Sequence, residues 1–210
     1  MCNPEKKEYK LNATLNNNSP IDLSKLDGPD HDQVVDEIAT AAETLGFFQV
    51  VNHGVPVELL EALKIAAHGF FGQPAEEICL SQGCSHSPLV QYGTSFAPEK
   101  EKALEWKDYL SMRYTNDGEA LVVWPEECRE VALEFLRISI KMVRKLVEIL
   151  MGKLGVTLDD AKIDALIGLK MVNMNFYPIC PNPELTVGVG RHSDLGTLTV
   201  LLQDGIGGLM

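Results

Sequence analysis

Two residues of this sequence, His192 and Asp194, have the types and the spacing that a metal ion requires of its ligands. Side chains alternate along an extended segment, so residues two positions apart project to the same side. An imidazole nitrogen and a carboxylate oxygen placed in this way can occupy adjacent positions on one ion, as in iron sites made of two histidines and one carboxylate. A surface His-x-Asp pair without any metal is the other interpretation, and the spacing by itself leaves both open.

Uncharged polar side chains form a second feature, in the segment LKMVNMNFYP at residues 169–178. The alternation of apolar and polar residues predicts a strand, with Asn173, Asn175 and Tyr177 on one face. A polar face on a strand is commonly half-exposed to solvent. Amides and a phenol without neighbouring charges would also suit a small anionic ligand at the mouth of a barrel.

The segments that must position these residues divide into helices followed by strands. Apolar residues at helical spacing predict helices that end at Gly46 and Gly155, and Pro56 is suited to the first turn of another helix. Thr157 with Asp160 resembles a capping box for a short helix. Period-two patterns and apolar runs predict strands, which cover residues 47–51, the region of 106–112, and three segments between 169 and 204.

This order of elements predicts an α+β fold in which a helical region packs on a β-domain. We expect residues 1–20 to form a disordered tail, because they are polar and rich in asparagine. Residues 21–165 are expected to form the helical region, and residues 166–210 the beginning of the β-domain.

Composition excludes several classes of partner. A net charge of −12 argues against nucleic acid or an anionic membrane as a partner. No apolar run reaches the roughly 18–20 residues of a membrane span, and the N-terminus has no apolar segment typical of a signal peptide. The five cysteines are irregularly spaced, which favours reduced thiols and a cytoplasmic protein.

Other residues that could do chemistry are interpreted more simply. Cys79, Cys84 and His86 are irregularly spaced and have no obvious fourth ligand, so we do not predict a zinc site. Trp106 and Tyr109 are expected to be packing residues, although they could border a substrate cavity.

Several separated motifs resemble the plant iron(II)/2-oxoglutarate-dependent dioxygenases. They are LGFFQVVNHGVP at residues 45–56, NMNFYPICPNPELTVGVGRHSDLGTLTVLLQD at 173–204, and GIGGL at 205–209. Within this family, YGTSFAPEKEKALEWKDYLSM at 92–112 and the stretch 155–194 are similar to feruloyl-CoA ortho-hydroxylases.

The resemblance implies a fold and roles for five residues. The β-domain at 166–210 would be the first strands of a double-stranded β-helix, or jelly-roll. His192 and Asp194 match the first histidine and the carboxylate that bind Fe(II), and Asn175 and Tyr177 match the pair that approaches 2-oxoglutarate. His53 matches a position whose role in the family is structural.

The resemblance also implies a reaction. Fe(II) and the co-substrate 2-oxoglutarate, with ascorbate as a plausible addition, would use dioxygen to hydroxylate an aromatic phenylpropanoid. For feruloyl CoA this leads to scopoletin-type coumarins. Another family oxygenase acting on a flavonoid or hormone precursor, and a non-catalytic product, are the alternatives. A CoA thioester would need local positive charge, but we interpret Lys100, Lys102 and Lys107 as a solvated face.

One departure from the family concerns the remaining ligands. The second iron-binding histidine and an Arg-x-Ser that binds 2-oxoglutarate follow several dozen residues after the His-x-Asp in the family. No such positions follow before Met210. We therefore expect a C-terminally truncated oxygenase whose full-length parent is an enzyme, and a 210-residue chain that is inactive by itself.

Overall fold

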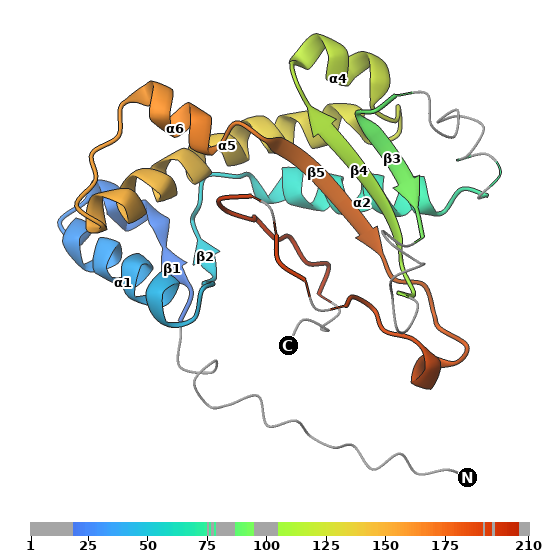
Figure 1. The fold of residues 1–210 in the computed structure, drawn as a ribbon, viewed down its shortest axis with the longest axis horizontal. Coiled ribbons are helices and arrows are strands. Elements are labelled where there is room, and N and C mark those ends of the chain that lie inside the picture. The colour runs from blue at the N-terminus through green and yellow to red at the C-terminus, as the bar shows by residue number, and fades with distance from the viewer. Residues whose placement is uncertain are drawn as a thin grey trace. The chain divides into compact units, whose positions relative to one another are not determined.

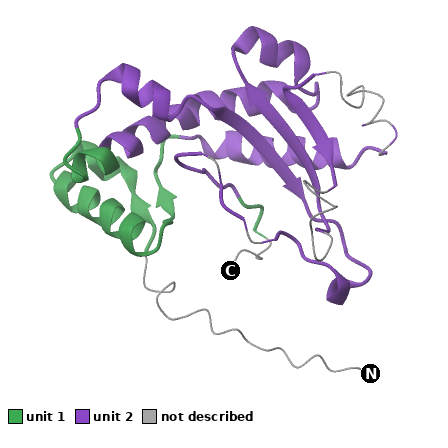
Figure 2. Cartoon of the chain, in the orientation of Figure 1, with its two compact units in different colours: residues 1–54, 149–156, 203–210 green, residues 55–148, 157–202 purple. Residues whose placement is uncertain are grey.

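The computed structural model describes residues 19–74, 76, 78, 87–94, 105–190, 192–194 and 196–205. The chain divides into two compact units, of which unit 1 comprises residues 1–54, 149–156 and 203–210, and unit 2 comprises residues 55–148 and 157–202 (Figure 2). The elements, shown in Figure 1, are β1 (Ile21–Asp22), η1 (Leu23–Asp27), α1 (His31–Thr44), β2 (Val50–Val51), α2 (Val57–Phe71), β3 (Val90–Gly93), β4 (Asp108–Tyr114), α4 (Asp117–Val123), α5 (Arg129–Lys153), α6 (Asp160–Leu166), β5 (Lys170–Phe176) and η2 (Pro183–Leu185).

Unit 1 is built around α1 and a short parallel pair of strands, β1 and β2. Val34, Ile38 and Ala41 recur at helical spacing on α1 and are buried, which is the amphipathic pattern that the sequence predicts. The helix ends near Gly46, whose φ of 76° is a left-handed conformation that glycine adopts readily. The same conformation occurs at Gly155 (φ 74°), just after the last turn of α5.

Unit 2 contains an antiparallel sheet in the order β3-β4-β5. The register sets Leu110 opposite Met174, and both side chains are buried. The next pair, Tyr109 and Asn175, projects from the other face because side chains alternate along each strand. The predicted alternation of β5 is therefore confirmed, with one face in the core and the other polar.

Helices α2, α4 and α5 supply the core that covers the apolar face of this sheet, and Figure 1 shows α2 and α5 running behind it. The helix predicted to end at Gly155 is confirmed as α5, and α2 begins directly after Pro56. The buried cluster consists of Leu63, Phe70, Ile78, Leu110, Met112, Ala120, Trp124, Cys128, Ala132, Leu133, Leu136, Val172 and Met174. Complete burial of one such large apolar side chain contributes about 1.5–3 kcal/mol.

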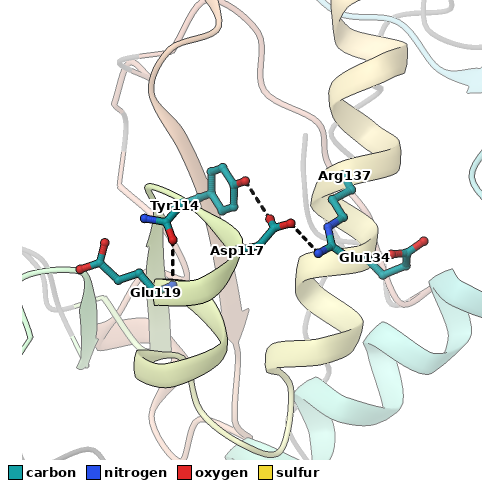
Figure 3. A network of polar contacts seen from close by, with 6 residues as sticks. Tyr114, Asp117, Glu119, Glu134 and Arg137 are labelled. Carbon is teal, nitrogen blue, oxygen red and sulfur yellow. Dashed lines mark hydrogen bonds and ion pairs between the residues drawn. The ribbon is translucent and has the colours of Figure 1, made fainter.

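A polar network joins β4, α4 and α5 at the edge of this core (Figure 3). The carboxylate of Asp117 accepts hydrogen bonds from the Tyr114 hydroxyl (2.8 Å) and from the Arg137 guanidinium (2.6 Å). Asn116 caps α4 by accepting the backbone N–H of Glu119 at 2.9 Å. The hydrogen bond from Arg137, followed by the one from Tyr114, lowers the pKa of Asp117.

The start of α6 differs from the prediction. Asp159, not Thr157, is the N-cap, and its side chain accepts the backbone N–H of Lys162 at 2.9 Å. Asp160 then lies in the first turn and forms an ion pair with Arg144 of α5 at 2.6 Å. The capping box predicted from Thr157 and Asp160 is therefore wrong, because a second aspartate takes the cap position.

The strand predictions are only partly confirmed. The strand predicted at 47–51 is limited to β2, and the one predicted near 106–112 is β4. Of the three strands predicted between 169 and 204, only β5 forms within the described part of this range. In the described residues after β5, the sole pairing is an isolated bridge between Val187 and Glu105. A strand is stabilised by its ladder partner, and the apolar run at 197–204 has none in this part of the chain.

The α+β class is confirmed, since the described residues combine helices with two sheets. Of the tail expected at residues 1–20, only Ser19 and Pro20 are described, and both are exposed. Within the described residues, every helix is either too short or too polar to span a bilayer.

Candidate functional site

His192 and Asp194 lie in an extended loop that follows β5 and η2, in unit 2. The two side chains face each other, with 3.3 Å between Nε2 of His192 and Oδ1 of Asp194. Their exposed fractions are 60% and 50%. The prediction that this spacing brings an imidazole and a carboxylate together on one side is confirmed, and the metal itself stays a prediction.

Each of the two side chains makes a further hydrogen bond through the atom that faces away from its partner, which orients both His192 and Asp194. Nδ1 of His192 donates a hydrogen bond to the Gly190 carbonyl oxygen at 2.9 Å, and Nε2 on the other side of the ring faces Asp194. Oδ2 of Asp194 accepts the hydroxyl of Thr199 at 2.6 Å, which leaves Oδ1 directed at the imidazole. Metal-binding histidines and carboxylates commonly have such supporting partners.

The donor set fits a divalent metal ion. Nε2 and Oδ1 face one another, so both atoms could bind one cation placed between them. Adjacent ligands of an octahedral ion, with bonds of about 2.1 Å at right angles, lie about 3.0 Å apart, and the observed 3.3 Å is close to this value. A protonated imidazole that donates to the carboxylate fits the same distance. The described residues offer no cluster of three or more metal-binding side chains, so the pair supplies two ligands.

A buried ion pair lies behind this loop and was missed by the sequence analysis. Nζ of Lys107 is 2.7 Å from Oε2 of Glu105, and the side chains are only 5% and 11% exposed. Oε1 of Glu105 accepts the backbone N–H of Gly190 at 2.7 Å. The interpretation of Lys107 as part of a solvated face is therefore wrong, while Lys100 and Lys102 lie outside the described residues. The Glu-x-Lys spacing in an extended segment was the available signal.

The environment of Glu105 favours its charged form. Burial acts to raise its pKa, but hydrogen bonds from Lys107 and from the Gly190 backbone, with the charges of Lys107 and His192, outweigh burial and lower it. Glu105 is therefore an anion beneath the loop that carries His192.

Asn175 and Tyr177 lie on and just after β5, on the polar side of the sheet. Both are exposed, Tyr177 to 50%. The Tyr177 ring contacts the loop that leads to His192, since a Cβ added to Gly188 would lie 3.5 Å from that ring. The structure thus places the amide and the phenol on one strand and the His-x-Asp pair on the loop that follows it.

The remaining sequence candidates are placed as follows. His53 is half-buried in a turn between Asn52 (φ 51°) and Gly54 (φ 83°), which suits a structural role. Tyr109 is 1% exposed, which confirms it as a packing residue, whereas Trp106 is 38% exposed. Cys79, Cys84 and His86 lie outside the described residues.

Comparison with known proteins identifies the family. The family described as non-haem dioxygenase in morphine synthesis N-terminal matches residues 19–127. The 2OG-Fe(II) oxygenase superfamily matches residues 169–210, the segment that contains His192 and Asp194.

Individual relatives agree with this result. The chain is 64% identical over 207 residues to scopoletin 8-hydroxylase of Arabidopsis thaliana, covering 98% of this chain and 57% of that protein. It is 55% identical over 193 residues to a feruloyl CoA ortho-hydroxylase of Ipomoea batatas, covering 90% and 53%. The chain thus spans about half the length of the curated relatives it matches.

A solved structure supports the same grouping. The crystal structure of JOX2 in complex with 2OG, Fe and JA superposes with a TM-score of 0.69 at 31% identity, covering 84% of this chain and 52% of that one. The chain belongs to the 2-oxoglutarate- and iron(II)-dependent non-haem dioxygenases.

Proposed function

We propose that this chain is part of a dioxygenase that uses Fe(II), 2-oxoglutarate and dioxygen to hydroxylate the aromatic ring of a coumarin-related phenylpropanoid. The observation that carries the proposal is the 64% identity to scopoletin 8-hydroxylase across 98% of the chain. The paired imidazole and carboxylate of His192 and Asp194 support it independently, because they are the donors that such an iron site uses.

Two substrates are favoured by specific observations. A scopoletin-like coumarin comes first, because identity to the scopoletin hydroxylase exceeds identity to the feruloyl CoA hydroxylase, 64% against 55%. Feruloyl CoA comes second and would demand positive groups for its phosphates. Lys107 does not supply one, because its ammonium is buried against Glu105. The net charge of −12 also favours the substrate without phosphates.

The roles of the chain's own residues follow from their positions. His192 and Asp194 would hold Fe(II), with further ligation from outside the described residues. When bound, the iron supplies oxidation of the substrate by dioxygen, coupled to decarboxylation of 2-oxoglutarate. The Asn175 amide and the Tyr177 hydroxyl, exposed on the polar face that precedes the loop, would hydrogen-bond 2-oxoglutarate. Ascorbate would serve as a supporting reductant.

The domain arrangement is also part of the proposal. Residues 1–20 would be a tail, residues 21–165 the helical region, and residues 166–210 the start of the jelly-roll. The sheet joins the last two regions, because β4 pairs with β5 from Asp108–Phe176 to Tyr114–Lys170. The likeness to a solved family member supports a jelly-roll in the whole protein. Free thiols at Cys128 and Cys180 support a reducing, cytoplasmic setting.

The test is a substrate comparison with the whole protein. Purified enzyme with Fe(II), 2-oxoglutarate and ascorbate is incubated with scopoletin, feruloyl CoA or a flavonoid, and products and succinate are measured by mass spectrometry. We expect hydroxylated scopoletin and stoichiometric succinate, and neither from the His192→Ala variant. Turnover of the flavonoid alone would contradict the proposed substrate class.

The non-catalytic alternative is tested on the 210 residues expressed by themselves. Two ligands bind a metal ion less tightly than three, so we expect this polypeptide to retain little iron after desalting and to form no product. Stoichiometric iron in it would contradict this expectation.

A further inference from the structure

The loop that carries His192 is attached to the segment 105–107 at two points. The backbone N–H of Trp106 donates to the Val187 carbonyl at 2.8 Å, and the Gly190 N–H donates to Oε1 of Glu105 at 2.7 Å. Gly190 also contacts the imidazole, because its carbonyl accepts a hydrogen bond from Nδ1 of His192 at 2.9 Å. One residue, Gly190, therefore bonds Glu105 on one side and His192 on the other.

The other carboxylate oxygen of Glu105 forms an ion pair. Lys107 lies 2.7 Å from Oε2, and both side chains are almost fully removed from solvent. A buried ion pair is a costly way to stabilise a fold, since apolar residues of similar size commonly serve as well or better. In this structure the carboxylate contacts an ammonium through one oxygen and a backbone N–H through the other, which would limit the orientations of that N–H.

Glycine at position 190 suits the close contact with the Glu105 carboxylate. A Cβ at this position would lie 3.1 Å from Oε1 of Glu105, which is tighter than an ordinary van der Waals contact. The absence of a side chain allows the carboxylate to approach the backbone. At Gly188, by contrast, an added Cβ would make an ordinary contact of 3.5 Å with the Tyr177 ring.

We propose that Glu105 and Lys107 are positioning residues for the metal ligand His192, acting through the backbone of Gly190. Glu105 anchors the N–H of the Val189–Gly190 peptide, and Gly190 presents the carbonyl of the next peptide to Nδ1 of His192, whose Nε2 is directed at Asp194. The inference rests on the proposed function, because it takes His192 to be a metal ligand. Removal of a partner that orients a metal ligand typically reduces metal affinity about 10–100-fold.

Two double variants of the whole protein separate positioning from charge. Glu105→Gln with Lys107→Met removes both buried charges and keeps an oxygen that accepts the Gly190 N–H. Glu105→Leu with Lys107→Met removes the charges and the acceptor together. Affinity for Mn²⁺, a redox-stable probe for Fe(II), is measured by calorimetry without substrate. We expect the Leu variant to bind about 10–100-fold more weakly than wild type, and the Gln variant to fall between the two, because it keeps the acceptor but loses the ammonium that fixes it.

A second measurement reads the imidazole directly. In histidine labelled with ¹⁵N, the metal-free wild type and the Gln variant should show His192 as the Nδ1–H tautomer. The Leu variant should show a mixture of the two tautomers. A role in folding alone would leave this tautomer unchanged in any variant that folds.

A glycine pair keeps the test decisive if the Leu variant does not fold. Gly190→Ala presses on the carboxylate and should weaken Mn²⁺ binding severalfold, whereas Gly188→Ala should not. Equal Mn²⁺ affinity in the two double variants, or in the two alanine variants, would overturn the inference. Wild-type protein that binds no Mn²⁺, or that binds it equally well after His192→Ala, would instead refute the proposed metal site.

Discussion

Replacement of Lys107 by methionine should destabilise the protein strongly, because it removes a positive charge 2.7 Å from the largely buried Glu105 carboxylate. The two charged atoms are 2.7 Å apart and the side chains are 5% and 11% exposed, so solvent screens the pair little. Breaking a buried pair by removing one partner costs about 3–5 kcal/mol. Glu105 keeps the hydrogen bond from Gly190, so the lower end, about 3 kcal/mol, is expected.

Urea unfolding of wild type, Lys107→Met, Glu105→Gln and the double variant measures this cost as a cycle. The double variant lacks both buried charges and should lie within about 1 kcal/mol of wild type, and be more stable than either single variant. A loss below about 1 kcal/mol in Lys107→Met would refute the reasoning, since only a hydrated surface pair is so weak. Additive single effects would refute it equally, because they would show that the two charges do not interact.

Three further predictions concern the fold that carries the site. Burial raises the pKa of Cys128 to about 12, so at pH 8 its native thiol should resist iodoacetamide in peptide mapping until the protein unfolds; fast native labelling would contradict this. The pKa of Asp117 is lowered, chiefly by the hydrogen bond from Arg137. Its contribution to stability should be present above an unfolded pKa of about 3.9 and be lost as the pH falls through the folded value. Arg137→Gln should raise that pKa in a carbon-13 NMR titration, and an unchanged value would contradict the network. Gly93→Ala should cost about 1–3 kcal/mol in urea unfolding, because its Cβ would lie 2.9 Å from the hydroxyl oxygen of buried Tyr109; no loss would show that the Tyr109 ring can move aside.

Local sequence signals predicted the parts of the fold that depend on local physics. Helices α1 and α5 follow from apolar residues at helical spacing, and Gly46 and Gly155 end them in the left-handed conformation that glycine favours. The two-residue periodicity of β5 and the common orientation of His192 and Asp194 follow from the geometry of extended chain.

The features that were missed depend on tertiary contacts. β3 is a four-residue strand that exists because β4 lies beside it. At α6 the sequence predicted Thr157 as the cap with Asp160, whereas Asp159 caps the helix and Asp160 pairs with Arg144 of α5. The predicted strands after β5 require partners that the described residues do not provide.

The ion pair beneath the loop was missed for a similar reason. The sequence predicted that Lys107 is part of a solvated face, whereas Lys107 is buried against Glu105, which also accepts the Gly190 N–H. Nothing in the local pattern indicates a contact between residues 85 positions apart. The two-residue spacing indicates that the Glu105 and Lys107 side chains point to the same side of the extended segment. It does not indicate that other parts of the chain bury that side.

The central claim is that His192 and Asp194 together bind a divalent metal ion, and metal affinity tests it most directly. Anaerobic titration of Fe(II) into the whole protein is compared among wild type, His192→Ala, Asp194→Ala and the control His53→Gln. We predict that each ligand variant binds Fe(II) at least about 100-fold more weakly than wild type, which exceeds the loss typical when a supporting partner of a ligand is removed. The control should bind Fe(II) with wild-type affinity. Unchanged affinity in His192→Ala, or a loss in His53→Gln as large as in the ligand variants, would contradict the assignment.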